Sequence, residues 1–196
     1  MLLTTERLII RPWHPLYDAQ QAFDIYGDPR VTRWLQVPPD SSIHVTQARL
    51  QRYVERTVNG LGVWAVIEQA INRAIGSLLL VPLPYSDNIS SSRNKIEIGW
   101  HFRPASWGYG YATEAAHAIL HYGFESLGLS TIHAVTSLDN GRSQRVMVRL
   151  GMECFGVTPD HYNQTLLLYG LAANNYSSGQ LESMADRTAS TSAPLT

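Results

Sequence analysis

The sequence has one cysteine, one lysine and almost no net charge, and each shortage excludes a class of protein. Cys154 has no second cysteine to pair with, so an intrachain disulfide and a four-cysteine metal site are both excluded. Lys95 is the only lysine, and the formal net charge is −1. Without a basic excess the chain has little with which to neutralise phosphates, so nucleic acid is not expected as a main partner.

Long apolar runs are also missing. No stretch approaches the ~20 consecutive apolar residues of a membrane-spanning helix, and residues 1–7 lack the pattern of a signal peptide. With 196 residues, of which 44% are hydrophobic, the chain can bury one full core. We expect a globular, cytoplasmic protein with no membrane partner, either a monomer or a homodimer formed through exposed strand edges.

The hydrophobic periodicity predicts one α+β domain around a mixed, mostly antiparallel central sheet. Strands are expected at 7–11, 62–68, 74–81, 96–102, 131–137, 154–157 and 164–171. Helices are expected at 18–26, 31–35, 41–58, 111–127 and 140–150, and loops at 82–94 and at Pro159-Asp160. Residues 172–196 are small, polar and rich in Ser and Thr, which predicts a domain over 1–171 followed by a disordered tail.

The most informative stretch is 96–115, which has the pattern of a strand, a glycine-rich turn and a helix start. Apolar residues at 96, 98, 100 and 102 alternate with Glu97, Gly99 and His101, which places the carboxylate on the opposite face of the strand. Gly108 and Gly110 in the turn allow the backbone to pass close to a ligand. A helix N-terminus in this position predicts an anion site. The turn lacks the third glycine of the dinucleotide fingerprint and the Gly-Lys-Ser/Thr of a Walker loop.

A second strand-to-helix junction lies at Asp139-Asn140-Gly141-Arg142-Ser143. Asn140, Ser143 and Met147 would share one helix side, at spacings of three and seven residues. By itself this pattern is typical of a capped helix. Two such junctions facing one sheet indicate a ligand between their strands.

Four ordered motifs carry a family resemblance. They are Thr-Glu-Arg-Leu-Ile-Ile-Arg-Pro at 5–12, Asp-Pro-Arg-Val-Thr-Arg-Trp at 28–34, the turn with Thr-Glu-Ala at 107–115, and Asn-Gly-Arg-Ser at 140–143 with Leu-Gly-Met at 150–152. Together they resemble the GNAT-superfamily N-acetyltransferases, in the branch of ribosomal-protein N-terminal (alanine/serine) acetyltransferases, over roughly residues 2–170. The resemblance implies a GNAT-like fold whose strands 96–102 and 131–137 splay apart at the cofactor cleft.

The resemblance also implies that acetyl-CoA is the co-substrate and that no metal is needed. The residues expected to bind it are Trp100, His101, Phe102, Trp107, Gly108, Tyr109, Gly110, Tyr111, Ala112, Thr113, Asn140 and Ser143. Backbone groups around 100–102 would pair with the pantetheine arm, N–H groups of 108–113 would hold the pyrophosphate, and Asn140 and Ser143 would flank the thioester.

Acetyl transfer to a primary amine needs a base for the amine proton, donors for the oxyanion and a proton or hydrogen bond for the leaving thiolate. Glu97 is the candidate base, directly or through water; the alternative is a carboxylate that pairs with an arginine. Ser143 is the candidate donor to the thiolate, because Met147 stands where many family members have a tyrosine. His101 shares the face of Glu97 and could relay a proton or be structural. Direct attack in a ternary complex is expected, and an acetylated Cys154 would instead indicate a ping-pong route.

The acceptor is a protein N-terminus or a small-molecule amine. The loops expected to shape its site carry Asp28, Asp40, Asp87 and Asp160, which a cationic acceptor would need. The alternative function is a non-catalytic acyl-CoA-binding module, which the missing tyrosine favours and the retained Glu97 and Ser143 oppose. A phosphate site for another nucleotide would need a base-recognition element that is not found.

Other conspicuous residues receive structural interpretations. Glu114, His117 and His121 share a helix face and are interpreted as a solvated face instead of a metal site. Cys154 is expected to be a small buried hydrophobic residue. The tryptophans expected in the core or in pocket walls are Trp13, Trp34, Trp64 and Trp100.

Overall fold

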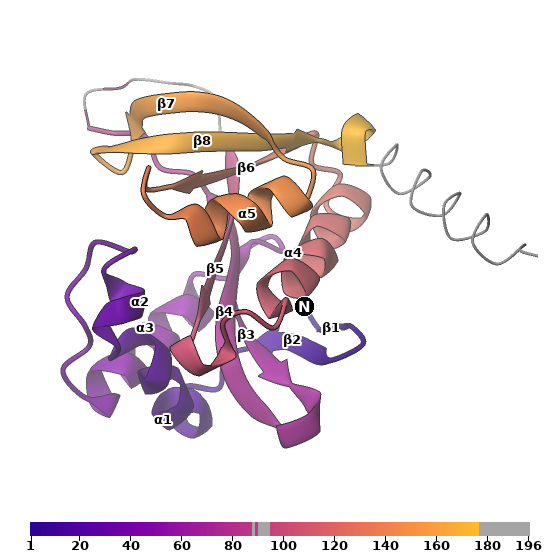
Figure 1. The fold of residues 1–196 in the computed structure, drawn as a ribbon. Helices are drawn as coiled ribbons and strands as arrows, with labels where there is room; N and C mark the ends of the chain where they lie inside the picture. Colours follow the sequence, from indigo (N-terminus) through magenta and orange to yellow (C-terminus); the bar gives the residue numbers. More distant parts are fainter. Residues whose placement is uncertain (88, 90–94, 177–196) are drawn as a thin grey trace, which may run out of the picture.

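The computed structural model describes residues 1–87, 89 and 95–176, and an eight-stranded sheet runs through the whole of this body (Figure 1). The strands are β1 (Leu3–Thr4), β2 (Leu8–Pro12), β3 (Gly62–Glu68), β4 (Arg73–Pro82), β5 (Ile96–Phe102), β6 (Thr131–Thr136), β7 (Glu153–His161) and β8 (Gln164–Ala172). Their order is β1-β2-β3-β4-β5-β6-β8-β7. Every neighbouring pair is antiparallel except β5 and β6. The mixed, mostly antiparallel sheet expected from the sequence is thereby confirmed.

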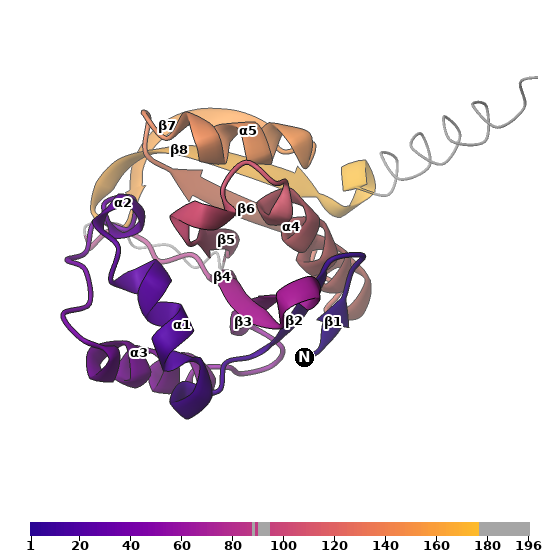
Figure 2. The same ribbon diagram turned by 60° about the horizontal axis from the view of Figure 1, so that its bottom comes forward.

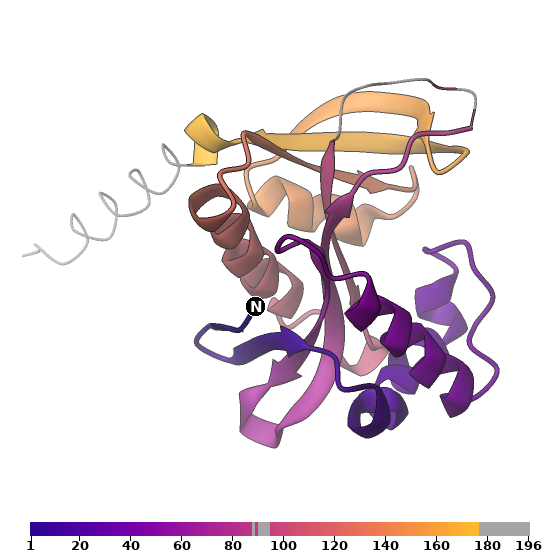
Figure 3. The same cartoon turned by 180° about the vertical axis from the view of Figure 1, so that it is seen from behind.

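Helices cover both faces of this sheet, as the turned views in Figures 2 and 3 show. They are α1 (Pro15–Tyr26), α2 (Pro29–Thr32), α3 (Ile43–Glu55), α4 (Tyr111–His121) with a π-helical continuation at Tyr122–Ser126, and α5 (Gly141–Arg149). Helices α1 and α3 bury Ile25, Tyr26 and Leu50 against one face, while α4 and α5 bury residues such as Ile119 and Met147 on the other. In the described ranges no helix combines the length and apolarity needed to span a bilayer.

The sheet changes character at β5 and β6. These two strands are parallel and are paired only at Ile96 with Ile132 and at Glu97 with His133. Beyond Glu97, β5 keeps its antiparallel ladder with β4 as far as Phe102 but has no further paired residues on β6. The predicted splay is therefore present, and it leaves one backbone edge of β5 available to a ligand.

Helix boundaries differ from the sequence pattern by a few residues. Helix α1 begins at Pro15, three residues before the predicted start at 18, and Asp18 accepts a hydrogen bond from the backbone N–H of His14 at 2.7 Å. Helix α2 runs over Pro29–Thr32, with Asp28 as its cap, instead of 31–35. Helix α3 is shorter than predicted and is capped by Ser42.

Three further predictions are corrected. Strand β7 continues through the expected loop at Pro159-Asp160; it is an edge strand, with a register irregularity between Thr158 and His161 that tolerates a proline. The domain extends beyond residue 171, since Ala172 belongs to β8 and 173–176 form a helical turn with Tyr176 buried. The rest of the predicted tail lies outside the described residues, as do parts of the 82–94 loop. Cys154 is exposed on β7 instead of buried.

Candidate active site

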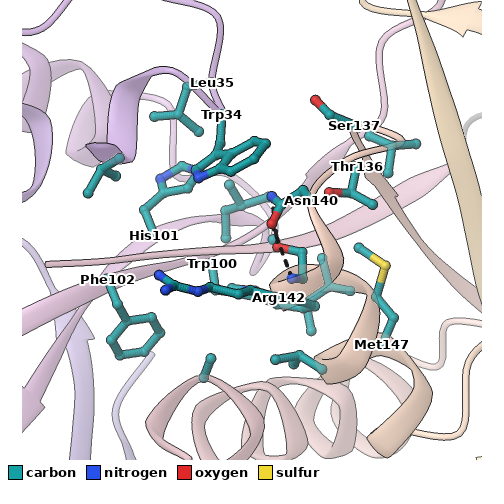
Figure 4. Close-up of a pocket in the computed structure, with 18 of the residues that line it drawn as sticks. Trp34, Leu35, Trp100, His101, Phe102, Thr136, Ser137, Asn140, Arg142 and Met147 are labelled. Carbon is teal, nitrogen blue, oxygen red and sulfur yellow. Dashed lines mark hydrogen bonds between the residues drawn. The ribbon is translucent and has the colours of Figure 1, made fainter. Parts of the chain in front are cut away.

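A cavity of about 660 Å³ opens where β5 and β6 separate. Its wall is formed by the α2 region and α3 at one end, by β5 and the β7–β8 hairpin along its length, and by the N-termini of α4 and α5 at the other end. Figure 4 shows Trp34, Leu35 and His101 on one side of this cavity, and Thr136, Asn140 and Met147 on the other. Two regions far apart in sequence therefore meet across one open space.

The turn before α4 forms one end of the cavity. The indole N–H of Trp107 donates to the carbonyl of Phe102 at 2.7 Å and closes the chain over a short 3₁₀ turn (Pro104–Ser106). Gly108 and Gly110 have φ values of 87° and 82°, a region that disfavours other residues. Gly110 is the N-cap of α4, and a Cβ at Gly108 would meet nothing within 4 Å. The backbone N–H groups of the first helical turn lack intrahelical partners and suit an anion.

The first turn of α5 forms the neighbouring wall. The side-chain oxygen of Asn140 accepts from the backbone N–H of Ser143 at 3.3 Å, and its amide nitrogen lies 3.3 Å from the Ser143 hydroxyl. The cap thus fixes Ser143 in the first turn of α5, one turn before the buried Met147. Arg142 and Arg145 line the cavity beside this turn, and Arg149 lines it from the last turn of α5. The Arg142 guanidinium lies 4.6 Å from the centre of the Trp107 ring. Positive charge therefore surrounds the predicted anion site.

Glu97 lies on β5 between the two ends. Its residue exposure is 7%, and burial raises its pKa from 4.5 to about 7. The hydroxyl of Tyr162 donates to its carboxylate at 2.5 Å, which counteracts part of that rise. This contact differs from the arginine pair considered for Glu97 from the sequence, and it leaves a carboxylate whose charge changes near neutral pH.

Tyr162 reaches Glu97 from the β7–β8 turn. Tyr162 and Asn163 both have positive φ values, 59° and 55°, as a two-residue type I′ hairpin requires. The loop between β4 and β5 holds this turn in place. The Asn163 side chain accepts a hydrogen bond from the backbone N–H of Asp87 and donates one to the Asp87 carboxylate, each 2.9 Å long. A bulky residue in the left-handed region is uncommon, so its placement over a buried carboxylate points to a role in the site.

His101 lies on the same face of β5, toward the α2 and α3 end. Its Nδ1 atom is 3.3 Å from the hydroxyl of Tyr26. Burial and the nearby Arg49 lower its pKa from 6.5 to about 4, so it is neutral at pH 7. Arg49 in turn is bound by Asp40, with 3.0 and 2.6 Å contacts to the two carboxylate oxygens.

The structure brings together most of the residues predicted for the site. Those that line the cavity are Glu97, Trp100, His101, Phe102, Trp107, Gly108, Gly110, Tyr111, Ala112, Thr113, Asn140 and Ser143. Tyr109 is not among the lining residues; it is 63% exposed, and its carbonyl accepts from Arg7 at 3.0 Å. The roles of these residues remain predictions.

Several other predictions have clear structural outcomes. Trp13 and Trp64 are buried in the core, while Trp34 and Trp100 line the cavity, as expected. Glu114 pairs with Arg7 at 2.7 Å, and the described part of the chain contains no cluster of three or more His, Cys, Asp or Glu that could hold a metal.

Two of the four acids predicted for a cationic acceptor are paired with arginines. Asp28 is paired with Arg30 at 2.6 Å, and Asp40 is 6% exposed and bound to Arg49. Asp87 is occupied by Asn163. None of the four predicted acids is among the residues that line the cavity.

Sequence reasoning missed Tyr162 and Arg49. Neither lies in a motif, and each depends on a contact between segments that are distant in the chain. The positive φ of Tyr162 has no sequence signal, because a Tyr-Asn pair is not the usual composition of a type I′ turn.

Comparisons with known proteins agree with this architecture. A family profile described as "Acetyltransferase (GNAT) domain" matches residues 7–153. The uncharacterised N-acetyltransferase YoaA of Bacillus subtilis is 28% identical over 164 residues, which are 83% of this chain and 89% of that protein. The FsC-acetyl coenzyme A-N(2)-transacetylase of Aspergillus fumigatus is 35% identical over 97 residues, 49% of this chain and 40% of that one.

Solved structures share the fold. A GNAT-family acetyltransferase from Bacillus anthracis superposes with a TM-score of 0.73 at 26% identity, covering 89% of this chain and 99% of that one. A ribosomal-protein-S5-alanine acetyltransferase from Vibrio fischeri gives a TM-score of 0.68 at 17% identity, with 90% and 98% coverage. The chain therefore belongs to the GNAT family of acetyltransferases, and the relatives named above are N-acetyltransferases. Members of this family use acetyl-CoA as the acetyl donor.

Proposed function

We propose that this protein transfers the acetyl group of acetyl-CoA to a primary amine, on a protein N-terminus or a small molecule, by direct attack in a ternary complex. The observation that carries the proposal is the position of Glu97. It is a buried carboxylate on a splayed strand, inside a cavity that joins an anion-binding end to a separate apolar end. A base between two ligands is what direct transfer requires.

The donor end of the cavity suits the phosphates and the pantetheine arm of acetyl-CoA. Backbone N–H groups of 108–113 would bind the pyrophosphate, with Arg142, Arg145 and Arg149 as further positive charge. The open edge of β5 around 100–102 would form hydrogen bonds with the amides of the arm, as an added strand would. Asn140 and Ser143 would then lie beside the thioester.

The chain's own residues would move the protons. Glu97 would accept a proton from the attacking amine as the nitrogen–carbon bond forms. As the carbon–sulfur bond breaks, Ser143 would donate a hydrogen bond to the leaving thiolate, which takes its proton from water, while Glu97 returns the proton of the amine to solvent. Met147 has no proton to give, so Ser143 is the group at this end of α5 best placed for that task.

A non-catalytic acyl-CoA-binding module is the second candidate, and the thioether of Met147 at the donor end is the feature that favours it. Such a module would bind acetyl-CoA without using Glu97. Transfer activity therefore discriminates between the two candidates.

Thermal unfolding with acetyl-CoA, free CoA and ATP in parallel is the first test. A ligand at ~100 times its Kd adds roughly 2.7 kcal/mol, which corresponds to a shift of several degrees. We expect both CoA species, and not ATP, to raise the Tm. Release of free CoA with an amine panel then measures transfer. Glu97→Gln and Ser143→Ala should each reduce this release, and full activity in both variants would contradict the assigned roles.

A further inference from the structure

The end of the cavity opposite the donor site is apolar and aromatic. We call it the acceptor wall and define it as Val31, Trp34, Leu35, Val37 and Tyr53. Its residues come from α2, from the segment after α2, and from α3. Trp34 and Leu35 lie on the same side of the cavity as His101, and Asn140 lies on the opposite side (Figure 4). Such a wall binds its ligand by removing apolar surface from water.

The charges that line the whole cavity do not favour a polycation. Among the described residues that line the cavity, Glu97 is the only carboxylate, whereas arginines 49, 142, 145 and 149 all line it. Asp40 does not line the cavity, and it is already bound by Arg49 and by the Thr46 hydroxyl, the latter at 2.9 Å. A second ammonium group on the acceptor would therefore find no second carboxylate in this lining, and its buried charge would stay unbalanced.

The polar groups near the wall can accept a single amine. His101 is neutral at pH 7 and does not repel an approaching ammonium. Glu97 supplies one negative charge or one proton acceptor between the wall and the donor end. One amine beside one apolar group therefore matches both the charge and the surface of this end.

We infer that the acceptor is a monoamine whose amino group adjoins an aromatic or branched apolar group, and that the acceptor wall selects it over polyamines and aminoglycosides. This inference rests on the proposed acetyl transfer. A small arylalkylamine and a peptide that begins with an apolar residue present the same chemistry, so both belong in the test.

The test measures CoA release with matched acceptors: phenylethylamine, leucine amide, a Phe-Ala-Ala peptide amide, spermidine and kanamycin. We expect kcat/KM for at least one apolar monoamine to exceed that for spermidine and kanamycin by more than about tenfold, since one well-buried apolar group contributes roughly a 10- to 200-fold preference. The ratio between phenylethylamine and the peptide distinguishes a small-molecule from a peptide source.

Trp34→Ala supplies the second arm. It should raise KM for the preferred monoamine about tenfold while leaving the Kd for acetyl-CoA, measured by calorimetry, unchanged. Tyr17→Ala, at a residue that is 76% exposed on α1 and outside the cavity, is the control and should change neither value. A preference for the polycations, an unchanged KM in Trp34→Ala, or acetyl-CoA binding without turnover of any apolar monoamine would overturn the inference. Failure of acetyl-CoA to bind would instead reject the proposed function on which it rests.

Discussion

Glu97 makes the stability of the fold depend on pH. Its pKa in the folded protein, about 7, lies above the ordinary value of 4.5 because burial disfavours the charged form. The folded state therefore holds a proton that the unfolded state releases between these two pH values. The resulting stabilisation is fully present below about pH 4.5 and is lost as the pH rises through about 7.

Glu97→Gln should remove this pH dependence. We expect the variant to be more stable than the wild type by about 1–3 kcal/mol at pH 8, because no charge is buried, and to differ little at pH 4.5. Urea unfolding at the two pH values measures the difference. Glu125→Gln, at an exposed glutamate, is the control and should match the wild type at both. An equal effect of Glu97→Gln at both pH values would contradict the shifted pKa.

Tyr162 is expected to act through Glu97 as a positioning residue. Its hydroxyl donates to the charged carboxylate, so Tyr162→Phe should raise the pKa of Glu97 further and move the acid limb of the kcat/KM profile to higher pH. A ¹³C NMR titration of the Glu97 carboxyl measures this pKa without any acceptor. Tyr17→Phe is the control, and an unshifted titration in Tyr162→Phe would reject the role.

At the scale of elements, the turn before α4 depends on two glycines in the left-handed region. An alanine at Gly108 has space but adopts its φ of 87° only with strain, at a cost of roughly 1–2 kcal/mol. Gly128→Ala is a matched control, because Gly128 has φ 64°, open space around its Cβ position, and no place in the cavity wall.

We expect both glycine variants to lose similar stability in urea, but only Gly108→Ala to weaken acetyl-CoA binding, by about tenfold or more in calorimetry. The added methyl group stands where the backbone would approach the pyrophosphate. Equal affinities in the two variants would show that this turn does not contact the donor.

The sequence predicts the bounds of an element correctly where its hydrophobic periodicity and the turn residues at its ends agree. Strands β3 and β5 have the predicted bounds, because each has clear hydrophobic and turn signals at its ends. Strand β7 was underestimated, since a proline in an edge strand reads like a loop. The exposure of Cys154 follows from that same edge position, which local sequence does not reveal.

The end of the cavity formed by the N-termini of α4 and α5 could be predicted because each half of it is local: a turn and the helix that follows. The acceptor end could not, because Arg49, Tyr53 and Tyr162 reach the cavity only through the packing of α3 and the β7–β8 hairpin. The same packing pairs Asp40 with Arg49, and this pair neutralises a carboxylate that the sequence predicted for a cationic acceptor.

At the scale of the whole molecule, the described part of the domain includes Tyr176, beyond the boundary at 171 expected from the sequence. Its ring is buried in the core beside α4, with its centre 5.0 Å from that of Phe124. Tyr176→Ala should reduce the free energy of unfolding by about 2–4 kcal/mol, because a large buried ring is lost. Urea unfolding tests this, with Tyr17→Ala as the control on an exposed tyrosine. An unchanged stability would place the end of the folded unit before residue 176.

The short pairing of β5 with β6 has a consequence for the order of events. Only two residue pairs join the strands β1–β5 to the strands β6–β8 within the sheet, yet the acceptor wall belongs to the first part and Ser143 to the second. A donor that hydrogen-bonds along the free edge of β5 would supply the missing link and fix the distance between the amine and the sulfur. We therefore expect an ordered reaction in which acetyl-CoA binds before the amine, so that free CoA is a competitive product inhibitor against acetyl-CoA and a noncompetitive one against the acceptor. While it is bound, the donor would take the place of a strand between β5 and β6.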